Sequence, residues 1–373
     1  MPSLSTPARI VSATVVLALI AAACGDESAT DATASDTAEA STVADSAPDE
    51  PTGGTSTTPP ATAELGGEST TPGASSDSAE VRTVDHAAGT TDVPASPQRV
   101  VALDESAAFV LLDLGIEPVQ VLGSFFTTGT EPVLDEYGIE IVPHDITNPS
   151  LEAVAALQPD LLVGADHPAS IEAYDSWSGV APTVLFSNDE PWQNQVELVA
   201  RAVGADDLGN ERIAQLESEI DRVVGRLDAE LDQAPTVSIV GQLSGMPFAL
   251  ARDGNAAGQF LDDLGLGRPR AQDVGTDEAP SGILFLSPEV IGDQDADTIV
   301  VLSGSIYESD PLRALPTFSA LTGDVVDVDG EQWNSTHPFG ISWILADLES
   351  VLLDGGPPAT ADDIASRWND YIG

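Results

Sequence analysis

The sequence has no lysine, a single cysteine and few aromatic residues. Its 12 basic residues are all arginines and face 62 acidic residues, which gives a formal net charge of −50 at pH 7. So negative a chain repels a phosphate backbone, and nucleic acid is therefore excluded as a partner. One cysteine allows no intramolecular disulfide and no cysteine-rich metal site.

What the chain does contain is enough apolar material for a sizeable core, with 42% hydrophobic residues over 373 positions. This length corresponds to roughly two to three domain-sized units. The acidity supports solubility and says little about the fold. Adaptation to a salty environment is one explanation of it, and the sequence leaves open whether that is its only role.

The cysteine, Cys24, directly follows an apolar run, IVSATVVLALIAAA (residues 10–23), which is preceded by Arg9. This run has the length of a signal peptide and is too short to span a bilayer comfortably. Its junction with Cys24 resembles a bacterial lipobox, although Ala21 stands where leucine is usual. We expect lipidation at Cys24, which would hold the protein on a membrane without spanning it. The alternative is an ordinary secreted protein cut near Ala23.

Residues 25–80 consist largely of Ser, Thr, Ala, Asp, Glu, Pro and Gly, as in STVADSAPDEPTGGTSTTPPATAE. The segment has no apolar periodicity and no basic residue, so it cannot bury a core. We expect a disordered acidic tether between the membrane and a folded body.

The folded body begins near Val81 and alternates short apolar strands with short helices. The segments RVVALDE, VQVLGS, DLLVGA and APTVLF are typical of buried strands, whereas SAAFVLLDLG and SLEAVAALQ have helical spacing. This alternation predicts an α/β fold with parallel sheets. From about Trp192 to Leu231 the pattern is strongly helical, and a second α/β series opens with TVSIVG. The sequence thus predicts two α/β lobes joined by one long helix.

Motifs for catalysis are missing from the sequence. GQLSG has the wrong spacing for a nucleophile elbow, and there is no phosphate loop or dinucleotide fingerprint. The four histidines are far apart and have no metal-ligand spacing. We therefore expect a binding protein rather than an enzyme, with an extracellular hydrolase or metal-dependent enzyme on a similar frame as the alternative.

The segment TVDHAAGTTDVPASPQRVVALDE (residues 83–105) resembles the opening of the type III substrate-binding proteins, lipoproteins that deliver ferric siderophores, haem or cobalamin to ABC importers. The resemblance continues through SLEAVAALQPDLLVG, YDSWSGVAPTV, FLDDLGLGRP and LSPEVIGDQDADTIVV. It implies two Rossmann-like lobes joined by a single long α-helix, the type III periplasmic-binding-protein fold. It also implies a monomeric receptor that takes a ferric siderophore to a permease, with the iron held by the siderophore and no cofactor of its own.

The chain is expected to consist of five consecutive segments. We expect a lipoprotein signal peptide at 1–23, the tether at 24–80, an N-terminal lobe at 81–208, an inter-lobe helix at 209–233 and a C-terminal lobe at 234–373.

The resemblance assigns permease docking to one glutamate on each lobe, and the matching positions are Glu152 in SLEAV and Glu289 in SPEVI. Each lies near the start of a short helix after a serine. A carboxylate there is also favoured by the helix macrodipole, so helix capping is the alternative role.

Ligands of open α/β sheets bind beyond the carboxyl ends of the strands. The residues that follow the expected strands, and are therefore candidate ligand contacts, are Phe125, Phe126, His167, Gln242, Met246, Arg252, Ser305, Tyr307, Trp333 and His337. Aromatic groups beside a few polar ones suit a bulky metal chelate, although ordinary core packing is the alternative for each residue.

Arg252 is the candidate cation for holding a carboxylate or catecholate of the ligand. Its alternative role is a surface ion pair with Asp253 or another acid. Because cations are so scarce, the sequence favours a hydroxamate-type siderophore over an anionic tris-catecholate. Haem or cobalamin is the alternative ligand, and His167 or His337 could then be an axial ligand.

Overall fold

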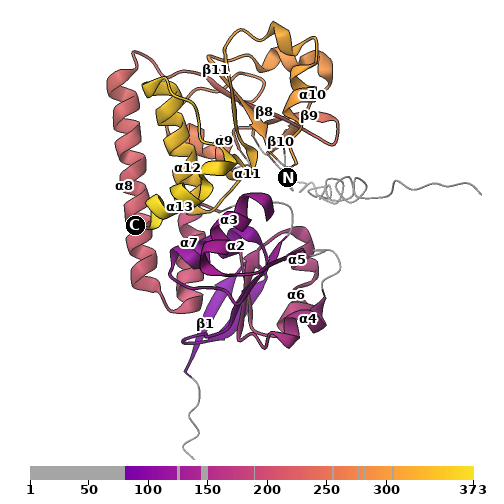
Figure 1. The fold of residues 1–373 in the computed structure, drawn as a ribbon, viewed down its shortest axis with the longest axis vertical. Helices are drawn as coiled ribbons and strands as arrows, with labels where there is room; N and C mark the ends of the chain where they lie inside the picture. Colours follow the sequence, from indigo (N-terminus) through magenta and orange to yellow (C-terminus); the bar gives the residue numbers. More distant parts are fainter. Residues whose placement is uncertain are drawn as a thin grey trace, which may run out of the picture.

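The computed structural model describes residues 80–123, 127–143, 150–188, 190–253, 256–275, 277–279, 282–304 and 306–373. These residues form two α/β lobes, each built on a five-stranded sheet. Helix α8 (Asp206–Glu230) runs along both lobes on one side of the molecule (Figure 1). Cys24 and the expected tether lie outside the described residues.

The sheet of the first lobe is wholly parallel and has the strand order β5-β4-β3-β6-β7. Its strands are β3 (Val100–Ala102), β4 (Gln120–Gly123), β5 (Ile141–Pro143), β6 (Leu161–Ala165) and β7 (Thr183–Phe186). Its helices are α2 (Glu105–Asp113), α3 (Thr127–Tyr137), α4 (Leu151–Ala156), α5 (Pro168–Glu172), α6 (Tyr174–Ser178) and α7 (Trp192–Val203). Strands β3, β6 and β7 are buried along their whole length, which explains their continuous apolar runs.

A hairpin of β1 (Val81–His86) and β2 (Gly89–Pro94) precedes this sheet and packs against β7. The sequence pattern did not separate this hairpin from the sheet that follows it.

The sheet of the second lobe is mixed, with the order β10-β9-β8-β11-β12. Its strands are β8 (Val237–Leu243), β9 (Met246–Leu250), β10 (Ile283–Phe285), β11 (Thr298–Ser303) and β12 (Asp324–Asp329). Strand β9 is antiparallel to both neighbours, so the expectation of wholly parallel sheets is wrong here. The cause is a two-residue turn in which Ser244 (φ 50°) and Gly245 (φ 76°) both adopt positive φ, as in the tight turns that close hairpins.

The remaining elements of the second lobe surround this sheet. They are α9 (Ala256–Asp263), η1 (Pro288–Gln294), α10 (Ser309–Arg313), η2 (Phe318–Ala320), α11 (Gly330–Trp333), α12 (Pro338–Leu348), η3 (Glu349–Asp354), η4 (Ala361–Asp363) and α13 (Ile364–Ile372).

The long helical stretch expected from Trp192 to Leu231 is divided into α7 and α8. Gly204 makes the division, because it ends α7 in the left-handed conformation with φ 81°. A Cβ at this position would also lie 2.9 Å from the carbonyl oxygen of Ala95, so glycine is required for space as well as for conformation.

The C-terminal helices return to the first lobe and bury aromatic side chains against it. Phe109 of α2 lies 4.5 Å from His337, 5.3 Å from Phe339 and 5.5 Å from Trp368, measured between ring centroids. The indole nitrogen of Trp368 donates a hydrogen bond to the Tyr137 hydroxyl at 3.0 Å. We name the group formed by Phe109, His337, Phe339, Trp343, Trp368 and Tyr371 the aromatic cluster. Through it, one continuous core extends across both lobes.

An ion pair between the buried Asp113 and the partly exposed Arg212 adjoins the aromatic cluster. Nε of Arg212 on α8 lies 3.1 Å from Oδ1 of Asp113, and the Tyr371 hydroxyl donates to Oδ2 at 3.0 Å. Burial raises the pKa of Asp113 to about 6, although Arg212 and Tyr371 oppose that shift. The three groups join α2, α8 and α13, so both lobes are tied to the connecting helix.

Among the helices of the described residues, none combines the length and the apolar character that crossing a membrane requires.

Candidate ligand site

The loops of the two lobes meet through hydrogen bonds that cross between them. The Thr336 hydroxyl, which follows α11, donates to Oδ1 of Asn188, which follows β7, at 2.9 Å. The backbone N–H of Gly129 in α3 donates to Oε2 of Glu331 at 2.6 Å. These contacts place the ends of the first sheet opposite the loops of the second lobe.

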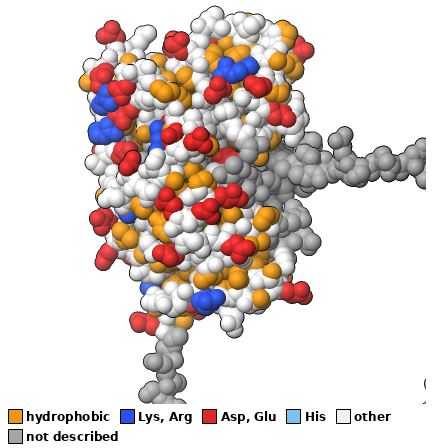
Figure 2. Space-filling model, in the orientation of Figure 1, with side chains coloured by type: hydrophobic (Ala, Val, Ile, Leu, Met, Phe, Trp, Pro, Cys, Tyr) orange, Lys and Arg blue, Asp and Glu red, His pale blue; other side chains and the backbone are white. Residues whose placement is uncertain are grey.

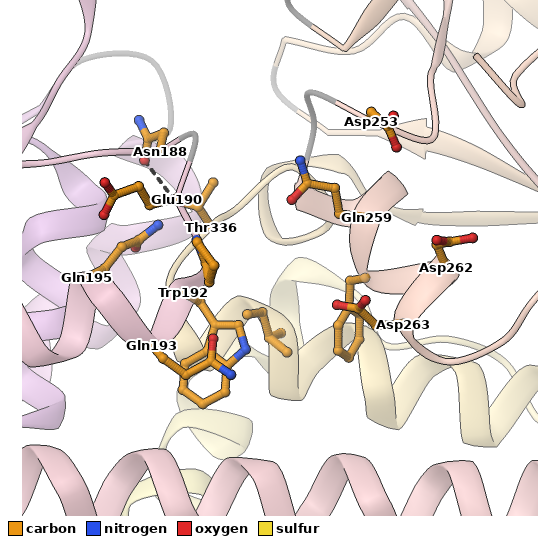
Figure 3. A pocket seen from close by; sticks show the side chains of 13 residues that line it. Asn188, Glu190, Trp192, Gln193, Gln195, Asp253, Gln259, Asp262, Asp263 and Thr336 are labelled. Atoms are coloured by element: carbon orange, nitrogen blue, oxygen red, sulfur yellow. Dashed lines mark hydrogen bonds between the residues drawn. The ribbon is translucent and has the colours of Figure 1, made fainter. Parts of the chain in front are cut away.

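Beside these contacts lies a pocket of about 370 Å³ between the lobes (Figure 3). Its walls are formed by Asn188, Glu190, Pro191, Trp192, Gln193 and Gln195 from the first lobe and by Asp253, Gln259, Phe260, Asp262, Asp263, Thr336 and Ile341 from the second. We name this the inter-lobe pocket. Trp192, Phe260 and Ile341 give it an apolar part, and most of the other side chains are polar.

The inter-lobe pocket is acidic, and its described lining residues include four carboxylates and no arginine or histidine. Asp263 lies beside Asp262 on α9, and burial together with the Asp262 charge raises the pKa of Asp263. Gln195 is only 1% exposed, and its Oε1 has no hydrogen-bond partner in the protein. On the face shown in Figure 2, acidic side chains lie on both lobes and arginines are few.

A family model described as "Periplasmic binding protein" matches residues 100–321 of the chain. The chain belongs to this family. Its members are substrate-binding proteins, and the two-lobed α/β architecture described above is that of the type III group.

Individual relatives agree with this assignment. The chain is 31% identical over 294 residues to "Probable siderophore-binding lipoprotein YfiY" of Bacillus subtilis, which covers 74% of this chain and 89% of the relative. It is 26% identical over 268 residues to "Fe(3+)-citrate-binding protein YfmC" of the same organism, covering 69% and 81%. The crystal structure of Staphylococcus aureus SirA complexed with staphyloferrin B has the same fold, with a TM-score of 0.64, 24% identity and coverage of 72% of this chain and 98% of SirA.

Of the residues expected to contact ligand, Gln242 and Tyr307 lie at neighbouring strand ends of the second lobe. Gln242 Nε2 donates to Oε2 of Glu308 at 3.2 Å, and the ring of Tyr307 packs 6.1 Å from that of Phe248. Both side chains are buried, and burial raises the pKa of Tyr307. Met246 is the first residue of β9, lies at the same end of the strands and is partly exposed. Phe125, Phe126 and Ser305 lie outside the described residues.

Arg252 forms the surface ion pairs that the sequence offered as its alternative role. Its guanidinium lies 3.2 Å from Asp253 and 2.5 Å from Asp273. Since β9 runs antiparallel to β8, the chain after β9 leaves the sheet at the opposite end of the strands from Gln242 and Met246. The strand-end rule therefore does not transfer to Arg252, because it holds for parallel strands.

Trp333 and His337 are core residues in this structure. Trp333 donates its indole N–H to Oδ2 of Asp347 at 2.8 Å. His337 is 3% exposed, stacks on Phe109 and accepts the Gly340 N–H through Nδ1 at 3.0 Å. Burial lowers the pKa of His337 to about 3, so this ring is neutral and serves as the N-cap of α12. His167 is the N-cap residue of α5 and is partly exposed.

The inter-lobe pocket contains residues that the strand-end rule could have nominated and others that it could not. Asn188 comes two residues after β7, in a segment already recognised as a strand, so the same rule identifies it. Gln195 lies inside α7, and Asp262 and Asp263 lie on α9. Their position in the pocket depends on how the two lobes pack, which no local pattern shows.

Glu152 and Glu289 occupy related positions in the two lobes. Both are exposed and lie in the first turn of a short helical element, α4 or η1, whose N-cap is a serine. Neither serine side chain makes a capping hydrogen bond. Each element follows the edge strand of its sheet, β5 or β10, and leads to the strand beside the central one. The two carboxylates are thus presented by equivalent connections of two similar lobes.

Proposed function

We propose that this protein captures a ferric siderophore between its two lobes and presents it, as a monomer and without catalysis, to the permease of an ABC importer. The observation that carries the proposal is a pocket lined by both lobes in a member of a substrate-binding family. The relatives named for siderophore and ferric citrate binding support the ligand class.

The structure also supports a receptor whose lobes move little. Because the aromatic cluster and the Asp113–Arg212 pair join both lobes to the same core, a large hinge motion would require buried contacts to break. Ligand would then enter a largely preformed site.

Binding is tested by titrating the full chain, purified in mild detergent, with ferric hydroxamate, catecholate and carboxylate siderophores. Trp192 lines the inter-lobe pocket, so its fluorescence is expected to be quenched on binding. Trp192→Phe serves as the matched control, because it removes the reporter and keeps an aromatic ring. If none of the siderophores gives saturable quenching, the proposal is contradicted.

We further propose that Glu152 and Glu289 dock onto a basic surface of the permease. They are exposed and lie on both lobes, and paired carboxylates can orient a large partner through complementary charge. In cells that carry Glu152→Gln together with Glu289→Gln, uptake of radioactive iron as the siderophore complex is expected to fall about tenfold or more, since docking relies on these charges.

The control for docking is Asp228→Asn, which removes an exposed carboxylate from α8. Siderophore affinity measured on the purified double variant should be unchanged. Normal uptake by the double variant would refute the docking assignment, while leaving capture of the siderophore intact.

The proposed anchor is a lipid on Cys24. Cys24→Ser is expected to release the protein from the membrane fraction while its siderophore affinity stays the same. Retention of this variant on membranes would contradict lipidation as the means of attachment.

A further inference from the structure

Apolar side chains are exposed on both sides of Glu289 in the second lobe. In the described part of the chain, four large apolar side chains are exposed, and two of them are Phe285 (47%) and Val290 (37%). Pro288, which lies between them, is exposed as well. We name the group formed by Phe285, Pro288, Glu289 and Val290 the second-lobe patch. Clustered apolar side chains at a protein surface are typical of a binding surface, whereas single ones are common everywhere.

The backbone that carries the second-lobe patch is held on the body of the lobe. Phe285 ends β10, and the pairing of β10 with β9 fixes its position. Ile291 follows the patch in η1 and is 0% exposed, so it anchors η1 in the core. The Thr317 hydroxyl donates a hydrogen bond to the carbonyl oxygen of Pro288. The apolar side chains therefore face solvent from a fixed backbone, and a partner would meet a preformed surface.

The corresponding surface of the first lobe lacks these apolar groups. The segments SLEAV (150–154) and SPEVI (287–291) match residue by residue, and their last residues, Val154 and Ile291, are both buried. In this match Glu152 corresponds to Glu289, and the exposed Ala153 corresponds to Val290. One lobe thus presents its carboxylate beside a methyl group, and the other presents it beside an isopropyl and a phenyl group.

The carboxylate within the second-lobe patch favours a basic protein as its partner. In a symmetric pair of copies joined through this patch, the two Glu289 side chains would approach each other with like charge. A chain with a net charge of −50 is likewise repelled by anionic lipid headgroups. A protein surface with a basic side chain beside an apolar recess satisfies both the carboxylate and its apolar neighbours.

We propose that the second-lobe patch is the main anchor of this protein on the permease: Glu289 pairs with a basic side chain, and Phe285 and Val290 fill an apolar recess beside it. The first lobe adds only Glu152, so the two lobes contribute unequally to docking. The inference rests on the proposed docking of Glu152 and Glu289, and it adds the apolar contacts and the inequality of the lobes.

The first test compares Phe285→Ser with Ile171→Ser in cells that take up radioactive iron as the siderophore complex. Phe285→Ser should lower the uptake rate about tenfold, because a few buried aromatic anchors supply most of the binding energy of an interface. Ile171→Ser removes another exposed apolar side chain, on α5 of the first lobe, and should leave uptake unchanged. Siderophore affinity of the purified variants should equal that of the parent, because neither residue lines the inter-lobe pocket.

Two further comparisons keep the test decisive if Phe285→Ser does not fold. Val290→Ala gives the second lobe the residue that the first lobe has at Ala153, and it should lower uptake less than Phe285→Ser does. Glu289→Gln alone should lower uptake more than Glu152→Gln alone, because the stronger contact surrounds Glu289. Equal losses for the two glutamine variants would overturn the inequality of the lobes.

The remaining outcomes separate this inference from the docking proposal. Normal uptake with Phe285→Ser and Val290→Ala, together with failed uptake by the double variant Glu152→Gln with Glu289→Gln, would overturn the apolar anchor and leave docking intact. Normal uptake by that double variant would refute docking itself.

Other occupants of the second-lobe patch are tested on the full chain carrying Cys24→Ser. Sedimentation should show a monomer, and the protein should not float with phosphatidylcholine vesicles. Dimerisation or flotation that Phe285→Ser abolishes would assign the patch to a second copy or to the bilayer, and would overturn its assignment to the permease.

Discussion

The junction between the lobes has two unlike sides. On one side, the aromatic cluster packs rings of α12 and α13 against Phe109, and it belongs to a core that extends through both lobes. On the other side, the inter-lobe pocket leaves about 370 Å³ between carboxylates and amides. The aromatic cluster holds the two lobes at a fixed distance. Contacts across the inter-lobe pocket are therefore not needed to hold the lobes together, and the pocket can stay open for a ligand.

The two sides of the junction also differ in the surroundings of their acidic side chains. Asp113, near the aromatic cluster, is buried and paired with Arg212 and Tyr371. Asp262 and Asp263 line the open pocket beside each other. Asp113 is thus buried against partners from other elements, whereas Asp262 and Asp263 are exposed.

The largest expected loss of stability comes from a substitution in the aromatic cluster. Trp368→Ala removes a ring that is 0% exposed and touches both lobes, and it should lower the free energy of unfolding by about 3–5 kcal/mol. Urea unfolding measures this loss. Trp192→Ala, on the pocket side, is the matched control and should cost less than half as much because Trp192 is only partly buried. Equal losses would contradict the division of roles between the two sides.

An intermediate effect on stability is expected from ionisation of Asp113, and this effect depends on pH. Its folded-state pKa of about 6 lies above the ordinary 3.8, so the folded state holds the proton more tightly than the unfolded chain. The stability gained in this way is complete below the ordinary pKa and is lost as the pH rises through about 6. Compared with Asp113→Asn, which cannot ionise, the parent protein should lose up to about 3 kcal/mol between about pH 4 and pH 7.

Urea unfolding over this pH range tests the prediction, and Asp228→Asn is the control. The exposed Asp228 should leave the pH profile parallel to that of the parent. If Asp113→Asn also gives a parallel profile, Asp113 is ionised at acidic pH in the folded state and the assignment of its raised pKa is wrong.

The smallest effect is expected on the polar side of the junction. Thr336→Val removes the hydrogen bond to Asn188 and should cost about 1 kcal/mol of stability, since the bond is partly exposed and water can replace it. Ser319→Ala, which removes an exposed hydroxyl that donates to Pro316, should cost less. A loss for Thr336→Val as large as that for Trp368→Ala would show that the polar side also holds the lobes together.

Much of the fold could be predicted because buried parallel strands have an unambiguous pattern. The apolar runs at β3, β6 and β7 are continuous, and the helical spacing of Leu216, Val223 and Leu227 matches the buried face of α8. The direction of β9 could not be predicted in this way. It depends on positive φ at Ser244 and Gly245, and that pair of residues does not by itself require a hairpin.

The site was less predictable because it depends on contacts between distant segments. Trp368 and Tyr137 are 231 residues apart and still share a hydrogen bond, and no local pattern indicates that α13 packs on the first lobe. For the same reason, His337 follows a strand of the second lobe as a ligand contact would, and its ring is nevertheless stacked on Phe109 in the core.

The return of α13 to the first lobe has a consequence for the order in which the molecule can be completed. A chain is synthesised from its N-terminus, so the first lobe leaves the ribosome long before Ile364–Ile372. Until that helix arrives, Phe109 and Tyr137 lack the indole ring that they contact in the finished protein. The first lobe therefore cannot complete its packing until Ile364–Ile372 has been synthesised and has docked against α2 and α3.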